Sequence, residues 1–210
     1  MIERLTPHES AVAPPSMAGP DHPMRKVTRR VAFDGGWDAE RARKVGALFD
    51  GMAADWASDS VEPSTASVIG DGLERGRLDR SGRWIELGSG TGAGTRVLAP
   101  HVAQLTAFDL AAAMLAEAPA HLAPRVHGDA NVLPFADATF DVVVMVNMLL
   151  FPHEVDRVLR PSGSVLWVNT LGDQTPIHLP PDDVCRALPG EWCGVTAEAG
   201  TGFWAVLTRS

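Results

Sequence analysis

A glycine-rich turn between a short apolar strand and a helix constrains the fold of this chain more than any other feature. In WIELGSGTGAG (residues 84–94), an apolar strand leads into Gly88, Gly90 and Gly92, and a helical segment follows. Glycine lets the backbone turn sharply and lets a ligand approach closely, because no Cβ stands in the way. A strand, a glycine-rich turn and a helix in this order indicate a doubly wound α/β sheet.

The rest of the chain continues this alternation of strands and helices. Five short apolar segments joined by helical connections predict a parallel sheet. They span residues 84–87, 105–108, 125–127, 141–146 and 164–168. Two final strands, 195–198 and 203–207, are separated by AGTG, which is too short to hold a crossover helix and therefore predicts an antiparallel hairpin at a sheet edge. The expected fold class is α/β, a doubly wound, Rossmann-like sheet of seven strands.

The part of the chain before the turn divides into a tail and a helical lead-in. Residues 1–23 contain five Pro and little apolar periodicity, so we expect them to be disordered or loosely attached. Residues 24–80 predict a helical lead-in or lid, with helices over 37–56 and about 65–74. Residues 81–210 then form the ligand-binding core.

Acidic residues follow the second and third predicted strands. Asp109 ends its strand about 20 residues after the first glycine, the spacing at which an acid reaches the ribose hydroxyls of an adenosine. Asp129, in GDANVLPFADATFD, is placed to accept a hydrogen bond from an adenine amino group. Asp also commonly caps helices and forms turns, but the register with the glycines favours ligand binding. Asp141 opens the fourth strand, and we interpret it as structural.

Together these motifs resemble the class I S-adenosylmethionine-dependent methyltransferases, in particular the small-molecule, type 11-like group. The resemblance runs from about residue 84 to 210 and rests on ELGSGTG, Asp109, the GDA-x-x-LPF segment and RVLRPSG at residues 157–163. It implies a strand order of 3-2-1-4-5-7-6 with an antiparallel strand 7. It also implies S-adenosylmethionine as the cofactor, with S-adenosylhomocysteine as the product.

The resemblance further implies which residues bind the cofactor. Glu86 would contact the amino end of the methionine moiety, and Asp109 would bind the ribose. Asp129 and Ala130 match the adenine edge, while Asn147 matches a position that faces both the methionine and the methyl acceptor. The full set, with Leu110 and Met114 as apolar walls on the adenine, is Glu86, Gly88, Ser89, Gly90, Thr91, Gly92, Asp109, Leu110, Met114, Asp129, Ala130 and Asn147.

The acceptor side is less well defined. A hydroxyl or protonated amine acceptor needs a base, and His153 is the best-placed titratable candidate. Its helix, residues 151–159, looks shorter than in the family, which implies an open acceptor side or one built partly by a second subunit. His22 and Asp34 are further candidates to face the acceptor. We interpret Phe33, Trp37, Phe49 and Trp56 as core residues in preference to an acceptor cage, with a lid role open for some.

Composition limits the partners. A net charge of -8 disfavours binding to a nucleic-acid backbone, and the longest apolar run, residues 142–151, is too short to span a bilayer. The N-terminus lacks the basic start and apolar core of a secretory signal. Cys185 and Cys193 are too few and isolated for a metal site or disulfide framework. We expect a cytoplasmic monomer or homodimer that acts on a small-molecule acceptor, with no metal, membrane or nucleic acid.

Two other functions fit parts of the pattern. Gly88, Gly90 and Ala93 also satisfy the dinucleotide fingerprint, so an NAD-dependent oxidoreductase is one alternative. Against it, a carboxylate at Glu86 is unfavourable beside a pyrophosphate, and little chain remains for a separate substrate domain. The second alternative is a module that binds the cofactor without turnover.

Overall fold

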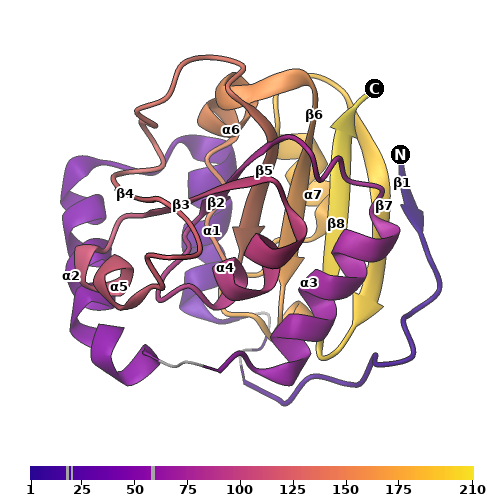
Figure 1. Ribbon diagram of the computed structural model, residues 1–210, viewed down its shortest axis with the longest axis horizontal. Helices are drawn as coiled ribbons and strands as arrows, with labels where there is room; N and C mark the ends of the chain where they lie inside the picture. Colours follow the sequence, from indigo (N-terminus) through magenta and orange to yellow (C-terminus); the bar gives the residue numbers. More distant parts are fainter. Residues whose placement is uncertain (18, 20, 58–59) are drawn as a thin grey trace.

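The structure of the chain is a computed structural model that describes residues 1–17, 19, 21–57 and 60–210. The described residues form one sheet of eight strands in the order β1-β7-β8-β6-β5-β2-β3-β4 (Figure 1). Neighbouring strands are parallel except where β8 pairs with β6 and β7. The strands are β1 (Ile2–Arg4), β2 (Arg83–Leu87), β3 (Gln104–Asp109), β4 (Arg125–His127), β5 (Phe140–Val146), β6 (Leu159–Asn169), β7 (Trp192–Ala199) and β8 (Gly202–Arg209).

The seven strands expected from the sequence are all present and in the expected order. Read from β4, the sheet runs β4-β3-β2-β5-β6-β8-β7, which is 3-2-1-4-5-7-6 in the expected numbering. The antiparallel strand is β8, also as expected. The doubly wound, Rossmann-like fold is therefore confirmed.

The N-terminal residues correct one expectation. Instead of a loose tail, residues 2–4 form β1, which pairs in parallel with β7 and occupies the sheet edge predicted for the C-terminal hairpin. Ile2 is buried in the core, and Leu5 N continues the pairing by donating to the Thr196 carbonyl (2.9 Å). The prolines begin only at Pro7, so they do not interrupt this strand, and the open edge of β7 provides the hydrogen-bonding partners that a free tail lacks.

Helices cover both faces of the sheet. Figure 1 shows α3 and α4 in front of the strands and α1 and α7 behind them. Side chains alternate along β2, so that Trp84 packs with the α3 side and Ile85 with the α1 side. The helices are α1 (Pro23–Asp34), α2 (Ala39–Trp56), α3 (Pro63–Arg75), α4 (Ala93–Leu98), α5 (Ala112–Glu117), α6 (Pro152–Val158) and α7 (Pro181–Ala187), with 3-10 turns η1 (Ala99–His101) and η2 (Gly172–Gln174).

The lead-in helix α2 lies against the ligand-binding end of the core. Asp38 caps its first turn by accepting from Arg41 N (2.8 Å). Farther along, Asp50 Oδ1 accepts from Ala113 N at the start of α5 (2.8 Å), and Ala53 packs against Met114. These contacts join the lead-in to the segment that follows β3.

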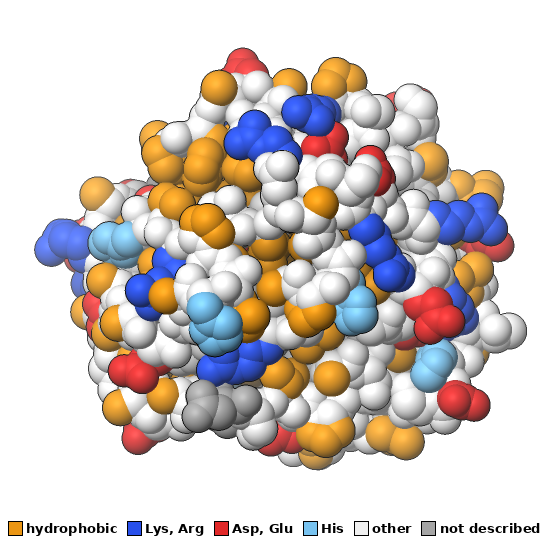
Figure 2. Space-filling model, in the orientation of Figure 1, with side chains coloured by type: hydrophobic (Ala, Val, Ile, Leu, Met, Phe, Trp, Pro, Cys, Tyr) orange, Lys and Arg blue, Asp and Glu red, His pale blue; other side chains and the backbone are white. Residues whose placement is uncertain are grey.

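The outer surface carries mixed charge. On the face shown in Figure 2, Lys and Arg side chains are interspersed with Asp and Glu. Within the described ranges, no helix combines the length and apolar character needed to cross a membrane. The same residues contain no group of three or more His, Cys, Asp or Glu arranged to hold a metal ion.

Candidate active site

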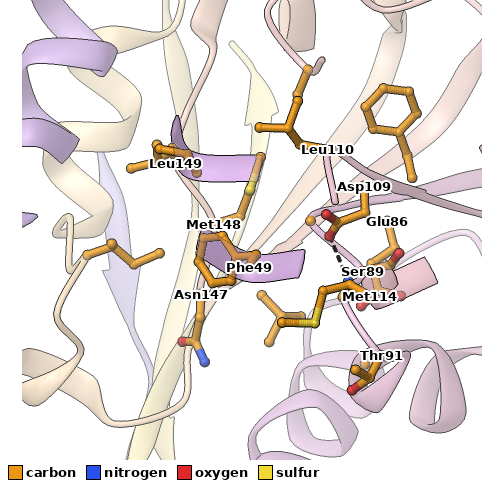
Figure 3. Close-up of a pocket in the computed structure, with 18 of the residues that line it drawn as sticks. Phe49, Glu86, Ser89, Thr91, Asp109, Leu110, Met114, Asn147, Met148 and Leu149 are labelled. Carbon is orange, nitrogen blue, oxygen red and sulfur yellow. Dashed lines mark hydrogen bonds between the residues drawn. The ribbon is translucent and has the colours of Figure 1, made fainter. Parts of the chain in front are cut away.

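A cavity of about 260 Å³ lies at the carboxyl ends of β2, β3, β4 and β5 (Figure 3). Ligands of open parallel sheets bind at this edge. Eleven of the twelve cofactor-binding residues expected from the sequence line the cavity. The exception is Gly92, which is the N-cap of α4 and is not part of the cavity wall.

The glycine-rich turn is held by hydrogen bonds within the chain. The backbone N–H groups of Gly88 and Ser89 both donate to the Phe108 carbonyl (2.8 and 3.1 Å), and that of Gly90 donates to Asp109 Oδ2 (2.7 Å). Gly90 has φ +53°, and an added Cβ would point into open space. The turn therefore presents a bare backbone surface to the cavity while its leading N–H groups are already engaged.

Glu86 lies behind this turn and is almost fully buried. Thr95 Oγ1 donates to its Oε2, and its Oε1 sits so close to Gly94 that a Cβ there would collide with it. Burial raises the pKa of Glu86 to about 7, the charge of Asp109 adds to this rise, and the Thr95 hydrogen bond opposes it. A buried carboxyl that ionises near neutral pH is suited to pair with a cationic ligand group.

Asp109 and Ser89 supply polar groups to the same wall. Asp109 Oδ1 accepts from Ala111 N (2.8 Å), which together with the Gly90 bond fixes the carboxylate. Burial raises the pKa of Asp109, and these backbone bonds oppose the rise. The Ser89 hydroxyl is buried and has no hydrogen-bond partner among the described residues. A ligand with hydroxyl or amino groups would satisfy both side chains.

Asp129 has a partner that sequence reasoning missed. The indole Nε1 of Trp37 donates to both carboxylate oxygens (3.0 and 2.9 Å), and Asn131 N donates to Oδ1 (2.9 Å). Trp37 lies between α1 and α2, far from Asp129 in the chain. No local motif signals this contact, because it depends on how the lead-in folds onto the core.

Asn147 turns the chain after β5. Its φ is +50°, a left-handed conformation in which Asn is enriched. Its Nδ2 donates to Thr170 Oγ1 (2.7 Å), and its Oδ1 accepts from Thr170 N (2.9 Å). The side chain thus fixes the ends of β5 and β6 to each other and directs residues 148–151 along the cavity.

The chain is similar to known proteins both in sequence and in structure. A family model described as "Methyltransferase domain" matches residues 85–167. The chain is 32% identical over 139 residues to a demethylmenaquinone methyltransferase of Mycolicibacterium vanbaalenii, covering 59% of this chain and 58% of that protein. It is 34% identical over 162 residues to the biotin biosynthesis bifunctional protein BioHC of Cellvibrio japonicus, covering 72% of this chain and 30% of that protein.

Two solved structures share the fold. The DhpI–SAH complex has a TM-score of 0.64 and 23% identity, covering 79% of this chain and 95% of that chain. A putative S-adenosyl-L-methionine-dependent methyltransferase from Methanococcus maripaludis has a TM-score of 0.56 and 17% identity, covering 82% and 94%. This chain contains a methyltransferase domain, matched over residues 85–167. The match spans little more than half of the mycobacterial relative's length.

The side of the cavity opposite the glycine-rich turn is apolar, and it is the side at which we expect the acceptor. It is formed by the segment after β5 together with parts of the lead-in and the loop after η2. Trp37 packs edge-on against Phe151, with ring centroids 5.2 Å apart. Although α6 is short, residues of the same chain line this side. The apolar residues concerned are Met24, Trp37, Met148, Leu149, Phe151 and Ile177.

His153 does not reach the cavity of the methyltransferase domain, contrary to expectation. Pro152, Val155 and Val158 turn one face of α6 toward the core, and helical periodicity places His153 on the exposed face. The two lead-in candidates do not line the cavity either: His22 caps α1, and Asp34 is exposed.

The lead-in aromatics fit the expected core role in part. Trp37 and Phe49 pack against buried apolar clusters, and Trp37, Phe49 and Trp56 also line the cavity. Phe49 and Trp56 pack edge-on at 5.9 Å, and Thr91 Oγ1 donates to the Trp56 carbonyl (3.2 Å). Phe33 is partly exposed under the guanidinium of Arg29. The apolar spacing of α2 predicts the helix but not which end of the core it covers.

Proposed function

We propose that this chain transfers a methyl group from S-adenosylmethionine to a small-molecule acceptor by in-line displacement. The observation that carries the proposal is the convergence of three carboxylates, from Glu86, Asp109 and Asp129, with the unpartnered hydroxyl of Ser89 on one cavity. A cytoplasmic location and a monomeric or homodimeric state, without nucleic-acid or membrane partners, belong to the same proposal. The names of the relatives differ in what they suggest about the acceptor, so we transfer none of them.

The residues of the cavity fit the polar groups of this cofactor. Glu86 pairs with the amino group of the methionine moiety, Asp109 accepts from the ribose hydroxyls, and Asp129 accepts from the adenine amino group. Leu110 and Met114 pack against the adenine ring. When bound, S-adenosylmethionine supplies a methyl group that is already electrophilic because it is attached to a sulfonium.

The remaining task of the protein is to orient the acceptor and exclude water. The apolar acceptor side serves both purposes. No His, Lys, Arg or Cys occurs among the described residues that line the cavity. The carboxyls of Glu86, Asp109 and Asp129 are engaged with the cofactor in this proposal. The acceptor therefore presents its nucleophilic atom without a base of its own, and the proton that it loses passes to solvent.

The turn itself supports this proposal over an NAD-dependent oxidoreductase. A pyrophosphate would need free N–H groups at the turn, but those of Gly88, Ser89 and Gly90 are engaged within the chain. Glu86 would also place a carboxylate behind the phosphates. Every ionisable side chain of the described cavity wall is assigned to the cofactor, which keeps a cofactor-binding module without turnover as the second candidate.

Calorimetry with S-adenosylmethionine, S-adenosylhomocysteine and NADH separates these functions. We expect the first two to bind and NADH to give no heat. Binding of NADH alone would contradict the proposal. Transfer of a labelled methyl group from S-adenosylmethionine to a panel of acceptors then distinguishes an enzyme from a binding module.

A further inference from the structure

The two halves of the cavity differ in chemistry. Figure 3 shows Glu86, Ser89 and Asp109 on one side and Met148 and Leu149 on the other, with Phe49 between them in this view. Once the polar side is assigned to the cofactor, the surface left for the acceptor is almost entirely apolar. This inference rests on the proposed function.

The ionisable side chains of the described cavity wall are all of one kind. All of its ionisable side chains within the described residues are carboxyls, from Glu86, Asp109 and Asp129. An anionic acceptor would enter a partly buried site without a cationic side chain to pair with, and burying an unpaired charge is costly. In the S-adenosylhomocysteine complex the sulfur is uncharged, so no sulfonium offsets this cost, and Asp109 and Asp129 add repulsion.

The apolar side also carries a pair of aromatic rings. Trp37 and Phe151 meet edge to face at 5.2 Å, and Trp37 is held in place by the bifurcated hydrogen bond from its indole N–H to Asp129. Both rings line the cavity, and aromatic side chains pack favourably against the rings of a ligand. Leu149 and Ile177 complete the wall with aliphatic surface.

We propose that the acceptor is an uncharged, apolar, aromatic molecule, and that the domain discriminates against anionic acceptors. Ile177 is suited to test this selectivity, because it lines the cavity in the loop before α7 and is only partly buried. A lysine there adds the missing cation. Methionine there keeps the wall apolar and serves as the matched control.

The experiment titrates the S-adenosylhomocysteine-saturated protein with 2-naphthol, which is uncharged at neutral pH, and with the anionic 2-naphthoate. We expect 2-naphthol to bind the wild type at least tenfold more tightly than 2-naphthoate. Ile177→Lys should reduce or reverse this preference for 2-naphthol over 2-naphthoate, and Ile177→Met should keep it. Retained S-adenosylhomocysteine binding shows that each variant is folded.

The outcomes separate this inference from the proposed function. If S-adenosylhomocysteine does not bind the wild type, the proposed function fails, and the acceptor inference fails with it. If it binds but 2-naphthoate binds as tightly as 2-naphthol, only the acceptor inference is overturned. Failure of both naphthalene probes to bind would overturn it as well, since the apolar wall would then not accept a neutral ring.

Discussion

The polar half of the cavity, which we assign to the cofactor, and the apolar half, which we assign to the acceptor, are built in opposite ways. The cofactor half comes from residues directly after consecutive parallel strands, and its side chains are fixed by hydrogen bonds such as Gly90 N to Asp109. The acceptor half joins Met24, Trp37 and Ile177, which lie far apart in the chain and contribute mainly apolar contact. Polar recognition therefore lies on the sheet, while acceptor selectivity depends on segments packed over it.

The largest effect is expected from Asp109→Ala in the cofactor half. The variant loses a charged acceptor for the ribose and leaves Gly90 N and Ala111 N without a partner. At about 1.5–3 kcal/mol for each hydrogen bond to a charged group, affinity should fall at least about 100-fold by calorimetry. Asp156→Ala, which removes an ion pair to Arg209 distant from the cavity wall, is the control and should bind normally.

Glu86→Gln should change binding and stability in opposite directions. Losing the charged partner of the methionine amino group should weaken S-adenosylmethionine binding about 10- to 100-fold. Burial raises the pKa of Glu86 from 4.5 to about 7. The wild type is therefore least affected by the buried carboxyl below pH 4.5, and its free energy of unfolding falls as pH rises through 7 and the carboxyl ionises. Relative to the wild type, the variant should gain up to about 3 kcal/mol between pH 5 and 8.

Guanidinium unfolding of the ligand-free Glu86→Gln variant and wild type at both pH values checks this prediction. A pH-independent difference in stability would show that Glu86 ionises normally in the folded state. In that case the weakened binding alone would remain as evidence for its role.

Gly90→Ala tests whether the bare backbone of the turn faces the ligand. The new methyl group should cost about tenfold in cofactor affinity through overpacking. Gly190→Ala is a matched control, because Gly190 also has positive φ and open space at its Cβ position but does not line the cavity. Both variants should lose about 1 kcal/mol of stability from left-handed strain. Equal cofactor affinities for the two would show that Gly90 does not touch the ligand.

Trp37→Phe tests the contact of Trp37 with Asp129 in the polar half of the cavity and with Phe151 in the apolar half. It keeps an aromatic ring against Phe151 but removes the hydrogen bonds to Asp129. A net loss of about 1 kcal/mol predicts roughly fivefold weaker cofactor binding. Trp192→Phe also removes an indole hydrogen bond, to the Pro189 carbonyl, but lies outside the cavity wall. If both variants bind alike, Trp37 does not position Asp129.

The smallest effect is expected from His153→Ala. Because His153 is exposed on α6 and does not line the cavity, methyl transfer should keep its rate and its pH profile. The measurement is turnover with labelled S-adenosylmethionine across pH 6–9. A large loss of rate with intact cofactor binding would restore His153 as a base and contradict the geometry described above.

Prediction from sequence succeeded where the topology of consecutive strands brings residues together. Gly88, Gly90, Asp109 and Asp129 lie at or just after the carboxyl ends of parallel strands, so their meeting at one sheet edge follows from topology. The prediction for His153 failed because this residue lies on α6, where one step of helical rotation decides whether a side chain faces the cavity or solvent. The Pro-rich composition of residues 1–23 likewise concealed the three-residue strand at their start.

The sequence by itself determined the doubly wound alternation of strands and helices, the final hairpin and the acids that follow the strands, whereas the strand order came from the resemblance to a known family. The alternation depends on periodicity, on turns that require glycine, and on the fixed handedness of β-α-β connections. Only the tertiary structure decided that Trp37 binds Asp129, that Ile177 lines the cavity, and that β1 pairs with β7 at the sheet edge. Such contacts come from packing between distant segments, where apolar surface is buried without a directional local signal.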